Sequence, residues 1–211
     1  MIPVFPVYLF DVDGTLVDSA IDICGAIQGV LVGEGVSGIS DEFLRRYIGQ
    51  HLSDVFSDIF PGALPGLIDQ MIEKYRRLYP ARQHASTSRY PGVLEALIQL
   101  GGRKSTATTK GSATTRIILE KFGLLPYFDH VQGTDGFPAK PAPDVIFKAL
   151  DVLGARPAEC LFVGDSESDM DAARRAGVKT AAVTYGYGKR EDLARWMPDY
   201  WITDLRDLLG G

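Results

Sequence analysis

The fold of this chain is decided by VYLF at residues 7–10, which runs directly into DVDGT at residues 11–15. A continuous apolar run of this length is typical of a strand buried on both faces of a parallel sheet. Two further apolar runs, at residues 160–163 and 180–184, end in Gly164-Asp165 and Tyr185-Gly186. Short apolar strands that end in acids or glycines are the pattern of an open α/β sheet.

Helical patterns alternate with these strands in the second half of the chain. They cover residues 93–100, 112–123, 145–150 and 170–176, and Asp144 is predicted to cap the third helix. This alternation predicts right-handed βαβ units with helices on both faces of the sheet.

Residues 19–88 do not show this alternation of helices and strands. Helical stretches lie at residues 21–32, 41–47, 52–60 and 67–78, with glycine and proline between them and no run of strand type. We therefore predict an α/β core domain of residues 1–18 and 89–211, with a small all-helical domain of residues 19–88 inserted after the first strand.

Composition excludes several classes of protein. The 211 residues are enough for one core domain with an insert. The net charge is −5 and the basic residues form no long run, so we expect no nucleic-acid partner.

Cys24 and Cys160 match no zinc or redox spacing and are predicted to be buried thiols of a reducing compartment. No apolar stretch approaches about 20 residues, so we expect a cytoplasmic protein without a membrane partner. The sequence specifies no oligomeric state.

Two pairs of acids follow predicted strands. Asp11 and Asp13 end the first strand, and Asp165 and Asp169 come directly after the run at residues 160–163. A parallel sheet places both pairs on one rim, where open α/β sheets bind ligands. Carboxylates so close repel one another and gain by sharing a divalent cation, and Mg²⁺ prefers one or two carboxylates with waters and phosphate oxygens.

Further residues predict an anion site. Thr108 and Thr109 precede a predicted helix, so a hydroxyl and free backbone N–H groups can hold a phosphate there. Lys140 stands in the proline-containing stretch at residues 139–144, which holds its ammonium as a point charge. Taken singly, these features also fit a solvated turn, an ordinary strand and a surface lysine.

The order of these motifs resembles the haloacid dehalogenase superfamily. DVDGTLVDS at residues 11–19, Thr108, KPAPD at 140–144 and GDSESD at 164–169 are similar to its four motifs, and the likeness spans essentially the whole chain. Within the superfamily the chain resembles the phosphoglycolate phosphatase-like branch. The resemblance implies a Rossmann-like core, with the helical insert as a cap after the first motif.

The resemblance also implies a Mg²⁺-dependent phosphatase that hydrolyses small phosphate monoesters, such as phosphoglycolate or sugar phosphates. Asp11 would form an aspartyl phosphate, and Asp13 would act as general acid and base. The implied Mg²⁺ ligands are Asp11, Asp165 and the backbone carbonyl of Asp13, and the implied phosphate-binding residues are Thr108, Thr109 and Lys140. Gly14, Thr15, Asp18 and Ser166 would support the site, and Asp169 would support the metal or Lys140.

Substrate choice is expected to depend on the cap. The candidates are Arg45, Arg46, Gly49, Gln50 and His51, because related caps present a specificity loop at this place. Either arginine could meet a substrate carboxylate bidentately, although both also fit a solvated helix face. Thr109 departs from the family pattern, in which asparagine often follows the second-motif threonine.

Several other functions stay open on the sequence. A sugar phosphomutase of the β-phosphoglucomutase type shares every core motif, and a pyrophosphatase of the same superfamily is a further alternative. A non-enzymatic phospho-receiver module also combines paired acids, a threonine and a lysine, but its order of motifs differs. Asp13 favours a phosphatase or mutase over a dehalogenase, because a halide leaves without needing a proton.

Overall fold

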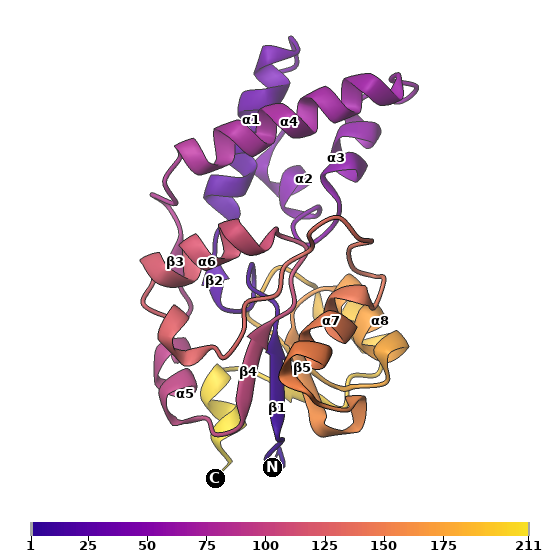
Figure 1. Cartoon of the computed structure of the whole chain (residues 1–211). Coiled ribbons are helices and arrows are strands. Elements are labelled where there is room, and N and C mark those ends of the chain that lie inside the picture. The colour runs from indigo at the N-terminus through magenta and orange to yellow at the C-terminus, as the bar shows by residue number, and fades with distance from the viewer. Residues whose placement is uncertain (1, 211) are drawn as a thin grey trace. The chain divides into compact units, whose positions relative to one another are not determined.

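The computed structural model of the chain describes residues 2–210 and divides them into two compact units (Figure 1). One unit combines the residues up to 18 with those from 88 onward, and the other comprises residues 19–87. The first unit contains a parallel sheet in the order β4-β1-β5-β6-β7. Its strands are β1 (Val7–Phe10), β4 (Arg103–Thr106), β5 (Cys160–Gly164), β6 (Lys179–Val183) and β7 (Tyr200–Ile202). The predicted α/β sheet is thus confirmed.

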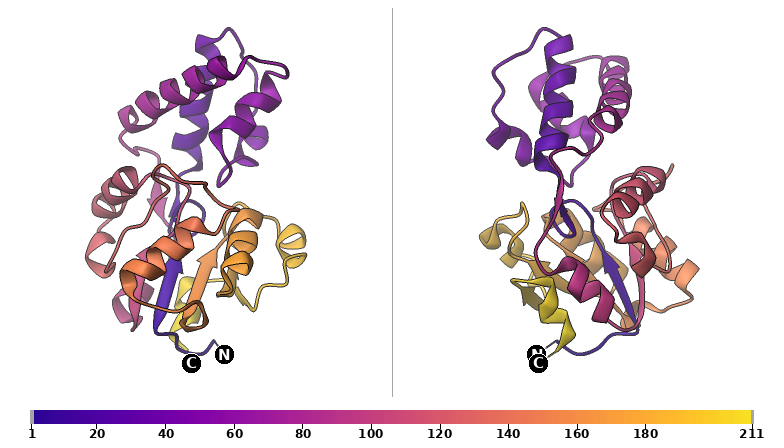
Figure 2. Two further views of the ribbon diagram at one scale, coloured as in Figure 1. Left: turned by 45° about the vertical axis from the view of Figure 1, so that its right-hand side comes forward. Right: turned by 90° about the vertical axis from the view of Figure 1, so that its left-hand side faces the viewer.

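Helices cover both faces of this sheet (Figure 2). Tyr8 and Phe10 of β1 pack on one face and Val7 and Leu9 on the other, as the alternation of side chains along a strand requires. The first face is covered by α5 (Val93–Gln99), α6 (Ser112–Lys121) and the 3₁₀ helix η3 (Leu205–Leu209). The second is covered by α7 (Asp144–Leu153) and α8 (Glu167–Ala176).

Short elements complete this unit. They are η1 (Leu125–Tyr127), η2 (Pro157–Glu159), α9 (Arg190–Ala194) and an antiparallel pair formed by β2 (Val17–Asp18) and β3 (Ser88–Arg89). The sequence did not predict β7 or this pair, because strands of two or three residues are too short to show a hydrophobic period. The chain leaves the core unit after β2 and re-enters it at β3, so this pair holds the two crossing points side by side.

The predicted cap of α7 is wrong. Pro143 occupies the N-cap place and makes no side-chain hydrogen bond, and Asp144 is the first helical residue. Proline needs no backbone N–H partner and its ring fixes φ near helical values, so the helix begins one residue earlier than side-chain capping predicts.

The second unit is all-helical, as predicted. It consists of α1 (Ala20–Gly33), α2 (Asp41–Arg45), α3 (Leu52–Ile59) and α4 (Pro65–Ala81). Asp22 of α1 is buried and accepts hydrogen bonds from the Thr87 hydroxyl at 2.8 Å and the Ser86 N–H at 2.9 Å. The Arg82 guanidinium lies 3.2 Å from the same carboxylate. This buried carboxylate therefore ties the start of α1 to the segment that follows α4.

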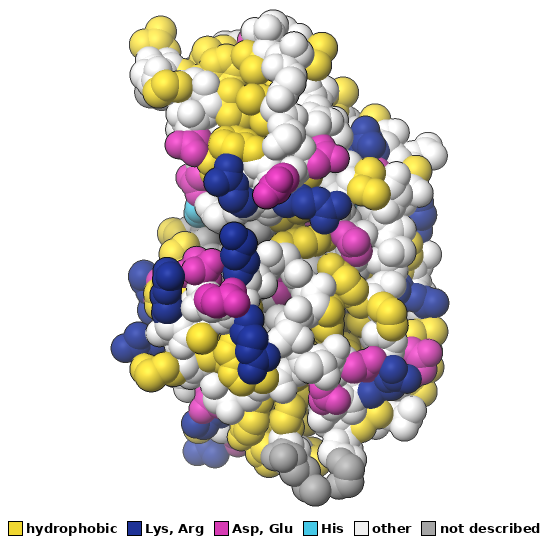
Figure 3. Space-filling view, turned by 180° about the vertical axis from the view of Figure 1, so that it is seen from behind, with side chains coloured by type: hydrophobic (Ala, Val, Ile, Leu, Met, Phe, Trp, Pro, Cys, Tyr) yellow, Lys and Arg dark blue, Asp and Glu magenta, His cyan; other side chains and the backbone are white. Residues whose placement is uncertain are grey.

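The basic side chains are dispersed on the surface, as the absence of a long basic run in the sequence predicts (Figure 3). On the face in Figure 3, basic and acidic side chains are interleaved and form no continuous basic stripe. Within residues 2–210, no helix has both the length and the apolar character needed to cross a bilayer.

Cys24 and Cys160 are buried and free, and burial raises the pKa of the Cys160 thiol to about 12.

Candidate active site

The first motif leaves the sheet at the carboxyl end of β1. The Asp11 N–H still donates to Val163 O at 2.9 Å, so the backbone of Asp11 continues the sheet pattern while its side chain stands at the rim. The chain then turns at Gly14, whose φ is +90°, and a Cβ there would lie 2.2 Å from Asp165 Oδ2. Only glycine allows this turn to approach Asp165 so closely.

Lys140 connects the two predicted acidic pairs. Its Nζ lies 2.7 Å from Asp11 Oδ1 and also contacts Asp169 Oδ1, and its side chain is 1% exposed. Burial alone would lower the pKa of Lys140, but the carboxylates of Asp11 and Asp169 outweigh it and hold that pKa above its usual value. Lys140 is therefore a charged ammonium against the predicted nucleophile.

Both carboxylate oxygens of Asp169 accept hydrogen bonds from the protein. Its Oδ1 accepts from Lys140, and its Oδ2 accepts from the Asp165 N–H at 3.1 Å, the Ser166 N–H at 2.9 Å and the Ser166 hydroxyl at 2.7 Å. Ser166 in turn caps α8 by accepting from the Asp169 N–H. Of the two supporting roles that the sequence left open for Asp169, this geometry favours the orientation of Lys140.

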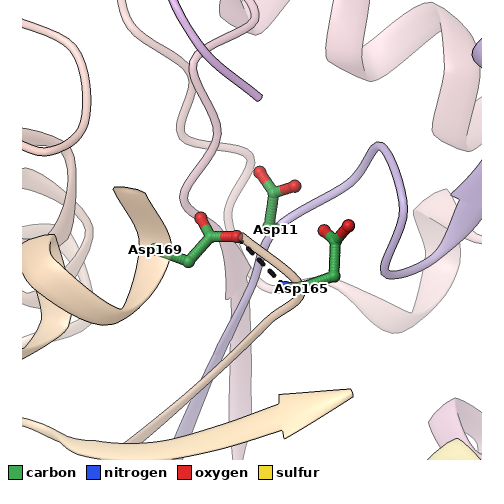
Figure 4. A group of neighbouring side chains, drawn as sticks. All are labelled: Asp11, Asp165 and Asp169. Carbon is green, nitrogen blue, oxygen red and sulfur yellow. Dashed lines mark hydrogen bonds between the residues drawn. The ribbon is translucent and has the colours of Figure 1, made fainter. Parts of the chain in front are cut away.

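Asp165 stands beside Asp11 at the same rim (Figure 4). One oxygen from each of Asp11, Asp165 and Asp169 falls within a group whose members lie within 4.8 Å of one another. The Thr15 hydroxyl lies 3.2 Å from Asp165 Oδ1, and the Tyr187 N–H donates to Oδ2 at 2.8 Å. The site thus gathers residues from both predicted motifs.

The loop at residues 185–188 is a part of the site that sequence reasoning missed. Besides the bond from Tyr187 to Asp165, the Tyr187 hydroxyl donates to Asp18 Oδ1 at 2.9 Å and the Tyr185 hydroxyl to Thr15 O at 2.9 Å. The available signal was the Tyr-Gly-Tyr-Gly sequence directly after a predicted strand. The loop holds both Asp165 and the turn that follows Asp11.

The two predicted phosphate-binding threonines lie just after β4. Thr108 is buried, and its backbone carbonyl accepts from the Thr134 hydroxyl at 2.9 Å. Thr109 is half-buried beside it. The next residue, Lys110, was not predicted, yet its Nζ lies 3.2 Å from Asp13 Oδ2. A lysine directly after the second motif was the signal that could have found it.

The cap candidates belong to the helical unit and are not placed relative to these residues. Arg45 ends α2, Arg46 follows it with its guanidinium 4.6 Å from the centre of the Phe43 ring, and His51 precedes α3. Gly49 is half-buried with a φ of +86°, and the Gln50 amide donates to Arg46 O at 2.7 Å. Their role in specificity stays a prediction.

The acids of the core site carry more negative charge than the protein neutralises. Burial, and after it the Asp169 and Asp11 charges, raises the pKa of Asp165 well above its usual value. Burial raises the pKa of Asp11 to about 6, against the opposing effect of Lys140. Lys110 pairs with Asp13, and Lys140 pairs with both Asp11 and Asp169, while the Asp165 carboxylate stands beside Asp11 and Asp169. A divalent cation fits this excess charge and these oxygen donors.

Comparison with known proteins agrees with this arrangement. The family model of haloacid dehalogenase-like hydrolases matches residues 8–183. The phosphoglycolate phosphatase of Aquifex aeolicus is 33% identical over 207 residues, which cover 96% of this chain and 94% of that one. The phosphoglycolate phosphatase of Vibrio parahaemolyticus is 32% identical, and the match covers 95% and 92% of the two chains.

Solved structures show the same fold. A haloacid dehalogenase-like hydrolase from Bacteroides fragilis superposes with a TM-score of 0.91 at 32% identity, and 97% of this chain and 99% of that one are covered. A predicted phosphatase from Clostridium acetobutylicum gives a TM-score of 0.90 at 27% identity over 98% and 97% of the two chains. The chain therefore belongs to the haloacid dehalogenase-like hydrolases and is a phosphatase of their phosphoglycolate phosphatase-like branch.

Proposed function

We propose that this protein is a Mg²⁺-dependent phosphatase that hydrolyses small phosphate monoesters, phosphoglycolate-like or sugar phosphates, through an aspartyl phosphate on Asp11. The observation that carries the proposal is the contact of the buried Lys140 ammonium with Asp11 at the rim where Asp165 also stands. A carboxylate is a weak nucleophile, so catalysis depends on positioning it and on neutralising the phosphoryl oxygens. Lys140 holds the Asp11 carboxylate in position, and the same ammonium would neutralise the phosphoryl oxygens that are transferred to it.

The reaction has two steps on this chain. A carboxylate oxygen of Asp11 attacks phosphorus, the ester P–O bond breaks, and Asp13 gives its proton to the departing oxygen. Asp13 then takes a proton from water, whose oxygen attacks phosphorus and releases phosphate and the free Asp11 carboxylate. In both steps Thr108, Thr109 and Lys140 would bind the phosphoryl oxygens.

The side-chain ligands of the metal would be Asp11 and Asp165. Asp169 accepts four hydrogen bonds from protein donors, more than either of these two carboxylates, which supports a role in orienting Lys140 instead. The backbone carbonyl of Asp13 would complete the set that the family resemblance implies. When bound, Mg²⁺ supplies positive charge next to the transferred phosphoryl group.

The helical unit of residues 19–87 would act as the cap that selects the substrate. Its exposed arginines, Arg45 and Arg46, follow each other at the end of α2 and support this role by their charge. Bidentate guanidinium groups are suited to carboxylates and phosphates.

The experiment measures phosphate release with Mg²⁺ from 2-phosphoglycolate, sugar phosphates, nucleotides and pyrophosphate. The wild type is compared with Asp11→Asn and Asp13→Asn. We expect Asp11→Asn to lose at least about 10³-fold in kcat, and Asp13→Asn roughly 10²- to 10⁴-fold. The matched control is Asp69→Asn, an exposed carboxylate of α4.

The outcomes separate the alternatives. Undiminished turnover by Asp11→Asn contradicts the nucleophile assignment. Isomerisation of a sugar phosphate that needs a bisphosphate activator and releases no net phosphate identifies a mutase instead. A long-lived phosphoprotein without turnover identifies a receiver module.

A further inference from the structure

The loop at residues 185–188 lies directly against the predicted metal ligand Asp165. A Cβ at Gly186 would come 2.4 Å from Asp165 Cβ and 2.5 Å from Gly14 O. A Cβ at Gly188 would come 2.0 Å from Asp165 O. The loop therefore fills the space between Asp165 and the turn of the first motif, and a displacement of the loop must move Asp165 as well.

The backbone of Tyr187 orients the Asp165 carboxylate. The Tyr187 N–H donates to Asp165 Oδ2 at 2.8 Å, while the Thr15 hydroxyl lies 3.2 Å from Oδ1. Hydrogen bonds to both oxygens of a carboxylate set its rotation, and removing such a partner of a metal ligand typically weakens metal binding about 10- to 100-fold. The direction in which Asp165 offers its lone pairs therefore depends on where the backbone of Tyr187 lies.

The side chain of Tyr187 holds that backbone from the opposite end. Its hydroxyl donates to Asp18 Oδ1 at 2.9 Å, a bond between residues 169 positions apart. A hydrogen bond to a carboxylate is stronger than one between neutral groups. Asp18 belongs to β2 and pairs with Ser88 of β3. Tyr187 thus connects Asp165 to the two short strands at which the chain leaves and re-enters the core unit.

We propose that Tyr187 is a positioning residue: its hydroxyl bond to Asp18 holds Asp165 in the orientation that binds Mg²⁺ and couples metal binding to the β2–β3 pair. Coupling between two sites is reciprocal, so a bond that strengthens Mg²⁺ binding also makes the β2–β3 pair more stable when Mg²⁺ is bound. The inference rests on the proposed function only through the metal site at Asp165, and not on the chemistry of phosphoryl transfer.

Isothermal titration of the whole chain with Mg²⁺, without substrate, tests the first half of the proposal. Tyr187→Phe keeps the ring and the backbone N–H but removes the hydroxyl, and we expect it to weaken Mg²⁺ binding roughly 5- to 10-fold. Asp18→Ala should cause a similar loss, and the double variant no further loss, because both changes remove the same bond. Asp18→Asn keeps an acceptor oxygen and should retain most of the affinity. The matched control is Tyr127→Phe, a half-buried tyrosine of η1.

Amide hydrogen exchange tests the second half. Saturating Mg²⁺ should slow exchange at residues 16–18 and 88–90 of the wild type, with α5 as the internal reference for general stabilisation of the core unit. In Tyr187→Phe this specific slowing should be lost. A purely structural role of the hydroxyl would instead change exchange by the same factor with and without Mg²⁺, and would overturn the coupling.

The remaining outcomes overturn separate statements. Equal Mg²⁺ affinity in the wild type and Tyr187→Phe overturns the positioning role. Additive losses in the double variant show that Asp18 and Tyr187 act separately, and they overturn the hydroxyl bond as the connection. If the wild type binds no Mg²⁺, the proposed metal site fails and this inference fails with it. A wild type that binds Mg²⁺ but hydrolyses no monoester contradicts the proposed function alone.

Discussion

Lys140 and Asp11 form a buried ion pair, with Nζ 2.7 Å from Oδ1, although 129 positions separate them in the sequence. The same ammonium contacts Asp169, so one positive charge is shared by two buried carboxylates. Buried charges are costly to leave unpaired, and this arrangement makes the site depend on a single lysine for its stability as well as its chemistry.

Replacing that lysine should therefore destabilise the core unit. We expect Lys140→Met to lower the free energy of unfolding by about 3–5 kcal/mol, because two buried carboxylates lose their cation. Urea denaturation followed by tryptophan fluorescence measures this, since Trp196 and Trp201 both belong to the core unit. Lys148→Met is the exposed control. A loss below about 1 kcal/mol would show that the pair contributes little.

The stability of the metal-free protein should depend on pH through Asp11. Burial raises the pKa of Asp11 from 3.8 to about 6, so the folded chain holds this proton more tightly than the unfolded chain. Its contribution to the free energy of unfolding is present below about pH 4 and is lost as pH rises towards 6, at about 1.4 kcal/mol per pKa unit.

The comparison with Asp11→Asn isolates this effect. Urea denaturation in the presence of a chelator, at intervals between pH 4 and pH 7, should give a steeper decline for the wild type than for the variant. Parallel pH profiles would contradict the raised pKa. Added Mg²⁺ should reverse the decline near pH 7, because a bound cation favours the ionised carboxylates.

The glycine at position 188 should be necessary for metal binding. A Cβ at Gly188 would lie 2.0 Å from Asp165 O, so alanine must displace the backbone of that predicted ligand. We expect Gly188→Ala to weaken Mg²⁺ binding at least about tenfold, measured by isothermal titration calorimetry. Gly101→Ala is the control, because a Cβ there would meet nothing within 4 Å. Equal affinities in the two variants would exclude a positioning role for the loop at residues 185–188.

The helical unit has its own buried anchor in Asp22. Asp22→Ala removes the acceptor of the Ser86 N–H, the Thr87 hydroxyl and the Arg82 guanidinium. We expect a loss of about 2–4 kcal/mol in that unit, seen as a lower melting temperature in far-ultraviolet circular dichroism. The tryptophan signal of the core unit should stay at its wild-type temperature. Asp69→Ala, an exposed acid of α4, should change neither signal.

Much of the site could be predicted because it follows from short local patterns. The apolar run at residues 7–10 and its acidic continuation placed Asp11 at a strand end, and a parallel sheet necessarily brings strand ends to one rim. The helices of the core and of residues 19–87 followed from hydrophobic periodicity and glycine stops, such as Gly177 after α8. Strands as short as β2, β3 and β7 carry too little pattern to be found in this way.

The sequence by itself determined the α/β core, the helical insert and the residues that resemble a phosphatase site, because each is set by the order of residues along one segment. Only the tertiary structure decided how distant segments meet. It joined Asp169 to Lys140, directed the Tyr187 N–H at Asp165 and placed Lys110 beside Asp13. These contacts join residues that lie between 22 and 97 positions apart in the sequence. They depend on where the loops after β4, β5 and β6 converge, and no local pattern of polarity encodes that convergence.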